Sequence, residues 1–373
     1  MGEPKDAIAQ IIKGQWPYIL ANCNSYQLRI LYAIKNCRTA VLGGELYVCD
    51  KCSKPHVRYN SCGNRHCPRC QNTEKLRWIE AREDQLIQTK YYHVVFTLPH
   101  ELNGICMSNQ RVMYRALFQS AWQTLNGFGW NKKFLGAQMG ATMVLHTWGS
   151  NLSYHPHVHC IVPGGGVTLR NKWKTAKGNG KYLFPVEALS KVFRAKYLQA
   201  IKESQVTISC SQISQVKNKE WVVYAKPAFG NKETLIKYLA RYAYKTAITH
   251  HRIRYFDNEK VVFSYTDYKH RNQKKEMTLS SKEFIRRFTQ HIQPKGFIRI
   301  RHYGILHSSW KSKLFPTSVS EKRDYKTMWK EKGINVDQCP NCKKGKLLFI
   351  ENIQPSRGPP RKQRKMTNQT LND

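Results

Sequence analysis

Apolar residues recur at helical spacing near the start of the chain. Within residues 1–40, Leu28, Leu31 and Ile34 lie three residues apart, so they would share one face of a helix. Residues 91–98 show another pattern, rich in aromatic and β-branched side chains and ended by a proline. That composition is typical of a strand. We therefore predict helices in the first region and a strand in the second.

The rest of the chain alternates the two patterns. The predicted helices are 74–90, 109–126, 186–204 and 233–248, and the predicted strands are 141–148, 157–163, 206–209, 221–225 and 261–265. Beyond about residue 355 the chain consists largely of polar and basic residues and proline, with little to bury. We therefore predict a disordered basic tail over residues 355–373.

The charge of the chain indicates a polyanionic partner. It carries 62 Lys and Arg against 24 Asp and Glu, a formal net charge of +38. An excess of this size repels itself unless a polyanion neutralises it, so we expect the partner to be a nucleic acid.

The sequence shows no feature of a membrane protein. It lacks a run of eighteen apolar residues, a basic amphipathic anchor, a lipidation motif and a secretory signal. We therefore expect no membrane partner and a cytoplasmic protein that associates with the nucleoid when it binds DNA. The oligomeric state stays open.

The 12 cysteines indicate metal sites. In a reducing cytoplasm, paired Cys-x-x-Cys spacing favours metal ligation over disulfides. The pairs Cys49/Cys52 and Cys67/Cys70 have the two-knuckle spacing of a tetrahedral zinc site, because each pair spans one edge of the tetrahedron. We predict one structural Zn²⁺ at these four thiols. The alternative is a set of free buried thiols.

A second set of four nitrogen and sulfur ligands lies nearby in the sequence. It consists of Cys23, Cys37, Cys62 and His66. We hypothesise a second Zn²⁺ there, although Cys23 would also suit a buried core position. Far along the chain, Cys339 and Cys342 have the spacing of half a zinc ribbon. Their partners cannot be named from the sequence, and a turn without metal explains the pair equally well.

Histidines suggest a catalytic metal. His157 and His159 are two residues apart in a predicted strand, so their side chains point the same way, about 6.6 Å apart. If residues 149–154 form the bend of a hairpin, His146 lies almost opposite His157 and supplies a third ligand. Three histidines favour Mn²⁺ or Zn²⁺ on affinity, while Mg²⁺ can serve in cells. The alternatives are a structural zinc site or an ordinary polar strand.

Two tyrosines follow on a predicted helix. Tyr238 and Tyr242 are four residues apart and share a face, whereas Tyr244 points elsewhere. A phenol with a pKa of about 10 needs a metal or a cation nearby to act as a nucleophile. The histidine site and the basic side chains here can supply both. The basic residues suited to DNA phosphates are Lys237, Arg241, Lys245 and Arg252. The alternative is that the tyrosines only pack beside the core.

Six stretches of the sequence carry a resemblance to a known family. They are CRTAVLGGELYVCDKC, YNSCGNRHCPRCQ, HVVFTLPHEL, VLHTWGSNLSYHPHVHCIVPGGG, KYLARYAYKTAITHHRI and PKGFIRIRHYGIL, in this order. The chain resembles the rolling-circle transposases of the insertion sequence 91 family, in the two-tyrosine branch of the HUH endonuclease superfamily. In that family the histidine pair corresponds to His157 and His159, and the tyrosine pair to Tyr238 and Tyr242. The spacing of His146 is similar to that of the third metal histidine of conjugative relaxases.

The resemblance implies an α+β fold, with an antiparallel HUH (Rep-like) sheet and flanking helices after a helical zinc-binding domain. We expect a DNA-recognition domain at residues 1–88, a catalytic domain at 89–275 and a basic region with half a zinc ribbon at 276–354. It also implies a transposase that nicks single-stranded or hairpin DNA at the ends of its element. The nick would leave a 5′-phosphotyrosine and a free 3′-OH, and strand transfer would follow by rolling-circle transposition, with Mg²⁺ or Mn²⁺ at the catalytic site.

Other functions stay open at this level. A plasmid replication initiator or a relaxase would use the same chemistry. A non-catalytic zinc-dependent DNA-binding protein would keep the cysteines but would need neither the histidine pair nor the tyrosine pair. A metal phosphoesterase would leave no protein–DNA adduct.

Overall fold

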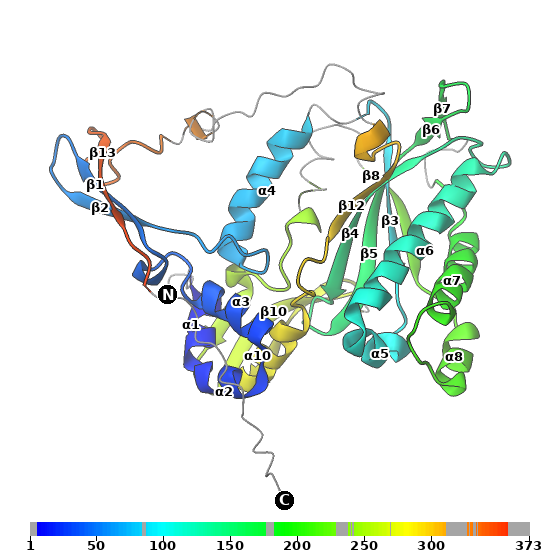
Figure 1. Cartoon of the computed structure of the whole chain (residues 1–373), viewed down its shortest axis with the longest axis horizontal. Helices are drawn as coiled ribbons and strands as arrows, with labels where there is room; N and C mark the ends of the chain where they lie inside the picture. Colours follow the sequence, from blue (N-terminus) through cyan, green and yellow to red (C-terminus); the bar gives the residue numbers. More distant parts are fainter. Residues whose placement is uncertain are drawn as a thin grey trace, which may run out of the picture.

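The structure is a computed structural model of the 373-residue chain. It describes residues 6–83, 87–176, 183–228, 238, 240, 242–268, 270–310, 327, 329–330, 333 and 335–356. Figure 1 shows a large sheet with helices packed against it and, beside it, a group of short helices with a second sheet.

A five-stranded antiparallel sheet forms the centre of the fold. Its strands lie in the order β12-β4-β5-β3-β8, and each neighbouring pair is antiparallel. They are β3 (Tyr91–Thr97), β4 (Gly140–Trp148), β5 (Tyr154–Pro163), β8 (Val223–Ala228) and β12 (Ile300–Gly304). The predicted α+β class, an antiparallel sheet with flanking helices, is confirmed.

The two faces of this sheet differ because successive side chains of a strand point to opposite sides. On one face, Val94 and Phe96 of β3 and Val158 of β5 are buried in the main apolar core. The helices on this side are α5 (Asn103–Ser108), α6 (Gln110–Trp130), α7 (Val186–Lys202) and α8 (Cys210–Lys217) (Figure 1). The opposite face carries histidines of β3, β4 and β5, so the alternation separates the core from the candidate site.

A second apolar core joins segments that lie far apart in the sequence. It contains α1 (Ala7–Gly14), α2 (Trp16–Asn22), α3 (Ser25–Lys35), the sheet of β9 (Ile253–Phe256), β10 (Lys260–Asp267) and β11 (Gln273–Ser280), and α10 (Ser281–Gln290). Helix α3 starts at a capping box, in which Asn24 and Gln27 each accept the other's backbone N–H. The helical N-terminal region is confirmed, and Leu28, Leu31 and Ile34 are buried as predicted.

A third sheet combines the N-terminal region with the C-terminal region. Its strands lie in the order β13-β1-β2: β1 (Gly44–Cys49), β2 (Pro55–Tyr59) and β13 (Leu347–Ile353). Figure 1 shows it at the left, with α4 (Pro68–Glu83) between it and the main sheet. The remaining short elements are β6 (Gly165–Val167), β7 (Trp173–Thr175) and the 3-10 turns η1 (Ala40–Leu42), η2 (His100–Leu102) and η3 (His250–Arg252).

The structure corrects several predicted elements. Residues 206–209 form no strand but lead into α8, which starts at a capping box of Ser209 and which the sequence pattern did not predict. The helix predicted for 74–90 begins earlier, at Pro68, and ends at Glu83. Strand β11 also went unpredicted, because its side chains alternate between exposed and half-buried positions and form no apolar run.

The tyrosine helix predicted for 233–248 lies partly outside the described residues. Tyr238, Ala240, Tyr242 and Ala243 are helical, whereas 245–249 are not, so the helix ends earlier than predicted. Of the predicted tail, residues 357–373 lie outside the described residues. The predicted domain boundaries stay predictions.

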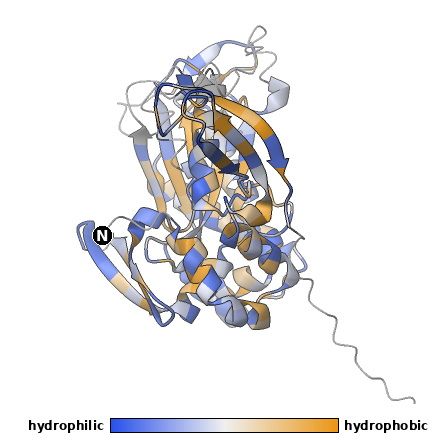
Figure 2. Cartoon of the chain, turned by 90° about the vertical axis from the view of Figure 1, so that its left-hand side faces the viewer, coloured by the Kyte–Doolittle hydropathy of each residue, from blue (hydrophilic) through white to orange (hydrophobic). Residues whose placement is uncertain are grey.

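Hydropathy follows the layers of the fold. In Figure 2 hydrophobic residues concentrate on the strands of the main sheet. Among the described residues, none of the helices combines the length and the apolar composition needed to cross a lipid bilayer.

Candidate active site and cysteine clusters

Three histidines converge on the face of the main sheet opposite the apolar core. The β4–β5 register places His146 opposite His157, and the turn between them is held by a 2.9 Å bond from the N–H of Gly149 to the carbonyl of Ser153. The predicted hairpin is therefore confirmed. One ring nitrogen from each of His146, His157 and His159 lies within 4.8 Å of the others. Such a set is compact enough to hold one divalent ion.

Carbonyl oxygens determine which ring nitrogens are available. A carbonyl only accepts, so the nitrogen that faces it must carry the proton. Nδ1 of His157 donates to the carbonyl of His155 at 2.6 Å, and Nε2 of His146 donates to the carbonyl of Tyr242 at 2.7 Å. We therefore assign the free lone pairs to Nε2 of His157 and Nδ1 of His146. Nε2 of His159 lies 3.1 Å from Nε2 of His157, facing the same point.

His93 is a residue of this site that the sequence analysis missed. It is buried on β3, which pairs with β5. Its Nε2 lies 2.9 Å from Nδ1 of His159, and its Nδ1 lies 2.7 Å from the hydroxyl of Tyr238. A signal was present, because residue 93 is an odd-numbered position of the strand and so faces away from Val94 and Phe96.

A metal-ligand role of His159 would fix the direction of these hydrogen bonds. If its Nε2 held an ion, its Nδ1 would keep the proton and would donate to Nε2 of His93. Nδ1 of His93 would then carry the remaining proton and would donate to the oxygen of Tyr238. The hydroxyl of Tyr242 donates to the same oxygen at 3.2 Å. Two donors on one phenol oxygen would stabilise its deprotonated form.

Burial keeps the histidines of the site neutral. It lowers the pKa of His157 and that of His93 to about 3, with nearby cationic groups contributing less. Burial also holds the pKa values of His146 and His159 well below their usual range, and repulsion from neighbouring histidines adds to the effect. At pH 7 all four rings are therefore neutral, as metal ligation requires.

Arg299 holds the end of the tyrosine helix against the sheet. Its guanidinium donates to the carbonyls of Ala243 at 2.6 Å and Lys245 at 3.4 Å, and to the side chain of Gln71 in α4 at 3.4 Å. Its own carbonyl accepts from the N–H of Leu145 in β4 at 3.0 Å. Burial lowers the pKa of Arg299 to about 10, so the group stays charged near pH 7 and suits the carbonyl end of a helix.

The predicted DNA contacts fall into three groups. Lys237 and Arg241 lie outside the described residues. Lys245 is exposed and available to a ligand. Arg252 instead donates to backbone carbonyls, among them that of Ser264 at 2.9 Å, and so holds the start of β9 in place. Its contact with DNA stays a prediction.

The cysteines form two clusters of four thiols, and their membership corrects the zinc prediction. One cluster holds Cys37, Cys62, Cys67 and Cys70, and the other holds Cys49, Cys52, Cys339 and Cys342. In the first, the Sγ of Cys70 lies 3.6 Å from that of Cys37 and 3.5 Å from that of Cys62. A zinc tetrahedron with Zn–S bonds of about 2.3 Å has an edge of about 3.8 Å, so these thiols fit one zinc ion.

The expected pairing of Cys49/Cys52 with Cys67/Cys70 is therefore wrong. Strand β2 is the reason: it lies between the two pairs in sequence, and its five extended residues span roughly 17 Å. Cys23 is buried in the second apolar core and is not one of the four clustered thiols. His66 is also outside the cluster, and its buried Nε2 has no hydrogen-bond partner among the described residues.

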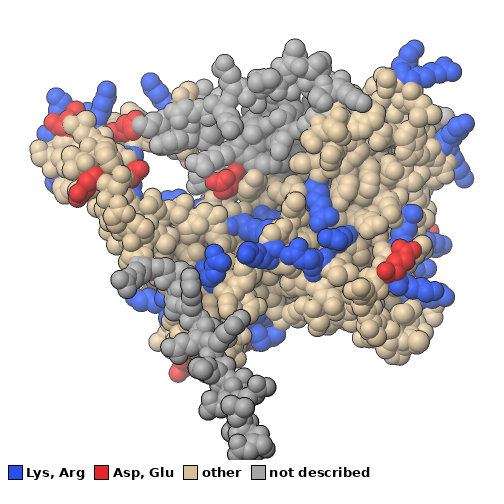
Figure 3. All heavy atoms as spheres, viewed as in Figure 1, with Lys and Arg blue, Asp and Glu red and all other residues tan. Residues whose placement is uncertain are grey.

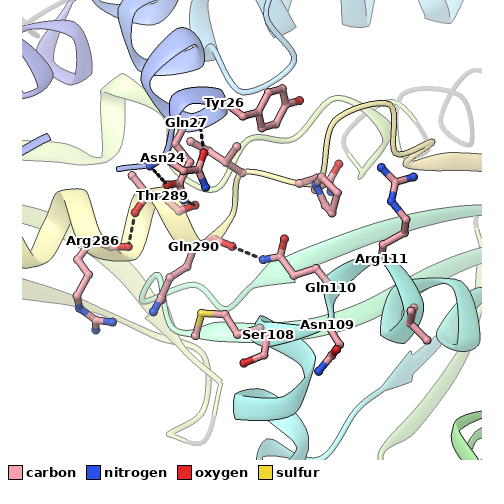
Figure 4. Close-up of a pocket in the computed structure, with 15 residues that line it drawn as sticks. Asn24, Tyr26, Gln27, Ser108, Asn109, Gln110, Arg111, Arg286, Thr289 and Gln290 are labelled. Carbon is pink, nitrogen blue, oxygen red and sulfur yellow. Dashed lines mark hydrogen bonds between the residues drawn. The ribbon is translucent and has the colours of Figure 1, made fainter. Parts of the chain in front are cut away.

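A polar cavity of about 510 Å³ lies elsewhere, between α3, α6 and α10. Figure 4 shows Gln27, Gln110, Arg111 and Arg286 on its walls. Its lining includes no clustered histidine or cysteine and neither Tyr238 nor Tyr242. It is therefore separate from the candidate active site.

Basic side chains gather on one face of the molecule. Figure 3 shows Lys and Arg forming a band across the middle of this face, with few Asp or Glu beside them. Such a band suits the phosphates of a nucleic acid.

Comparison with known proteins identifies the family. A family model described as "Putative transposase" matches residues 140–313, and one described as "Transposase zinc-binding domain" matches residues 11–98. The putative transposase y4qJ of Sinorhizobium fredii (strain NBRC 101917 / NGR234) is 36% identical over 366 residues, covering 90% of this chain and 92% of that protein. The chain belongs to the insertion sequence 91 family of transposases.

Two further similarities are weaker. The transposase for insertion sequence element IS801 of Pseudomonas savastanoi pv. phaseolicola is 32% identical over 288 residues, covering 72% of this chain and 68% of that protein. Among solved structures, the conjugative relaxase TrwC in complex with oriT DNA covers 40% of this chain and 69% of that chain, at 10% identity and a TM-score of 0.23. So low a score does not bear on the fold.

Proposed function

We propose that this transposase cuts and rejoins single-stranded DNA at the ends of its insertion sequence, with Tyr238 and Tyr242 as nucleophiles. The observation that supports it most directly is the chain of contacts from Tyr238 through His93 to His159. These contacts place Tyr238, and with it the tyrosine helix, beside the histidine set. A non-catalytic DNA-binding protein has no use for such a contact.

Tyr238 is suited to the first attack because its oxygen faces donors from His93 and Tyr242. Its phenolate attacks the phosphorus, a Tyr–O–P bond forms, and the bond to the 3′-oxygen breaks. That oxygen takes up a proton and becomes a free 3′-OH, while the 5′ end stays on Tyr238. The phosphodiester is retained in the tyrosine ester, so rejoining needs no ATP.

The histidine set fits a divalent ion. His146, His157 and His159 would hold Mg²⁺ or Mn²⁺, which would polarise the scissile phosphate and stabilise charge on the leaving oxygen. The three rings are neutral, with His146 and His159 buried and His157 half-buried, and among the described residues no acidic side chain joins their cluster. The carbonyl of Tyr242 orients His146, so the tyrosine helix also positions part of this set.

Tyr242 is suited to a second strand. Its ring centroid lies 4.2 Å from that of His159, and its hydroxyl is 3.2 Å from that of Tyr238. It can therefore attack at the same place while Tyr238 still holds the first strand. Two nucleophiles used in turn would permit strand transfer without loss of the first covalent link.

Binding of DNA would rest on the net charge of +38 and on a zinc-stabilised N-terminal region. We assign one zinc ion to Cys37, Cys62, Cys67 and Cys70. The phosphate contacts would come from Lys237, Arg241 and Lys245, and the substrate would be a single strand or a hairpin end. A plasmid replication initiator or a relaxase would show the same cleavage, and sequence repeats flanking the gene would distinguish them.

The test is covalent capture. Protein, Mn²⁺ or Mg²⁺ and labelled single-stranded element-end DNA should give a denaturant-resistant adduct, and chelation of the metal should prevent it. His157→Ala and His159→Ala should abolish the adduct, and His146→Ala should weaken it strongly, while all three still bind DNA. His155→Ala is the matched control, because His155 lies on the same strand outside the three-histidine set. Free phosphate ends without an adduct would indicate a phosphoesterase instead.

A further inference from the structure

The second cysteine cluster joins two regions that lie far apart in the sequence, with 293 positions between Cys49 and Cys342. The Sγ of Cys49 lies 3.6 Å from that of Cys342, and the Sγ of Cys52 lies 3.8 Å from that of Cys339. A disulfide would need about 2 Å. The observed distances instead match the edge of about 3.8 Å of a zinc–thiolate tetrahedron.

The two halves of this cluster have the same local structure. The residue after each second cysteine has a left-handed backbone, with φ of 54° at Ser53 and 56° at Lys343. In both turns its N–H donates at 3.0 Å to the carbonyl of the first cysteine, Cys49 or Cys339. Two matching turns that face each other are the arrangement of a zinc ribbon. Cys339 and Cys342, whose partners could not be named from the sequence, therefore lie beside Cys49 and Cys52.

Backbone N–H groups are already directed at the sulfurs. Those of Lys51 and Cys52 donate to the Sγ of Cys49 at 3.4 Å, and that of Gly345 donates to the Sγ of Cys342 at 3.3 Å. Such donors stabilise thiolates, the form that binds metal. Gly345 also leaves the space that the cluster needs, because a Cβ there would collide with the Sγ of Cys49.

The sheet around the cluster buries few apolar side chains, so its core contributes little to its stability. Its buried apolar residues are Cys49, Cys339 and Leu347, whereas Phe349 and Ile350 of β13 are each 53% exposed. Strand β13 nevertheless pairs along the whole of β1. Small sheets of this kind usually need a metal or a disulfide for stability.

The environment also suits the charge of the complex. Four thiolates and one Zn²⁺ carry a net charge of about −2. The chain near both turns is rich in lysine: Lys51, Lys54, Lys343, Lys344 and Lys346. The side chain of His56 lies 3.5 Å from the Sγ of Cys339 and can donate to it.

We propose that Cys49, Cys52, Cys339 and Cys342 bind a second structural zinc ion, which clips residues 335–356 onto the N-terminal zinc-binding region. The site is complete only when both regions of the chain are present. The C-terminal strand thereby becomes part of the N-terminal module, and the catalytic sheet lies between the two segments in sequence. This proposal does not depend on the tyrosine chemistry.

Metal analysis tests the site directly. The counts are made in full-length protein that also carries His157→Ala and His159→Ala, so that the histidine set of His146, His157 and His159 holds no zinc. This protein should contain two zinc ions per chain, and the Cys339→Ser/Cys342→Ser double variant made in it should contain one. Cys210→Ser is the matched control, because Cys210 is exposed and lies outside both clusters, and it should keep two. One zinc in the protein with all its cysteines, or two in the double variant, would overturn the proposal.

Thiol labelling of the wild-type protein gives a second test that needs no variant. With zinc bound, Cys339 and Cys342 should resist alkylation while Cys210 reacts at once. When a chelator removes the zinc ion from this cluster, Cys49, Cys52, Cys339 and Cys342 should become reactive together. If Cys339 and Cys342 react as fast as Cys210 while Cys49 and Cys52 stay protected, residues 335–356 are not clipped by metal.

Discussion

The hydroxyl of Tyr238 lies 2.7 Å from Nδ1 of His93, a strand residue 145 positions earlier in the chain. The hydroxyl of Tyr242 reaches Tyr238 rather than a histidine. The two tyrosines, equivalent in the sequence pattern, are therefore different in the structure. Tyr238 is the one connected directly to the histidine network.

This asymmetry predicts different effects for the two tyrosines. Tyr238→Phe should slow the first cleavage by roughly 10³-fold or more, because it removes the better-prepared nucleophile. Tyr242→Phe should still form an adduct but fail to complete strand transfer, and the double variant should form none. Adduct yield and mass spectrometry of the DNA-linked peptide measure this, with Tyr244→Phe as the control. An adduct in the double variant, or one mapped to Tyr244, would refute the assignment.

His93 should act by positioning and by donation to Tyr238. His93→Ala should retain the fold and lower the rate of adduct formation about 10- to 100-fold at pH 7. If His93 stabilises the phenolate, the rate of the variant should recover partly at high pH, where the phenol loses its proton to solvent. A pure packing role would lower the rate equally at every pH. His100→Ala, an exposed histidine, is the control.

Arg299 should couple the tyrosine helix to the sheet. Arg299→Met leaves the carbonyls of Ala243 and Lys245 without their donor, which should cost about 2 to 3 kcal/mol of unfolding free energy. The displaced tyrosines should also react about 100-fold more slowly. Urea unfolding and single-turnover cleavage at saturating DNA measure the two effects. Arg301→Met, in strand β12 just after Arg299, should change neither by a comparable amount.

His291 should make stability fall in acid. Its burial lowers its pKa to about 4, against about 6.5 in an unfolded chain. Between these values the unfolded state binds more protons, so stability is full above pH 6.5 and declines as the pH falls toward 4. At pH 5 the loss from this residue is about 2 kcal/mol relative to pH 7.

The variant His291→Gln isolates the contribution of His291 to the loss of stability in acid. Its side chain can still donate to the carbonyl of Leu152, which His291 contacts through Nε2 at 3.3 Å. Urea midpoints at pH 7 and pH 5 should therefore differ less in the variant than in the wild-type protein. Zinc loss and the other buried histidines affect both proteins alike. Equal acid sensitivity of the two would contradict the depressed pKa of His291.

Local spacing determined much of the site in advance. The two-residue spacing of His157 and His159 put both rings on one strand face, and the short turn brought His146 opposite His157. The four-residue spacing of Tyr238 and Tyr242 put both hydroxyls on one helix face. These relationships depend only on the geometry of one element or one hairpin, which a sequence pattern encodes directly.

Tertiary structure alone decided which distant groups meet. It brought His93 to Tyr238, Arg299 to the end of the tyrosine helix, and Cys339 and Cys342 to Cys49 and Cys52. Each Cys-x-x-Cys motif has the spacing of zinc ligands, but such a motif specifies one edge of a tetrahedron and says nothing about the opposite edge. That edge is chosen when strands β1, β2 and β13 pair, and such long-range pairing depends on the packing of the whole chain.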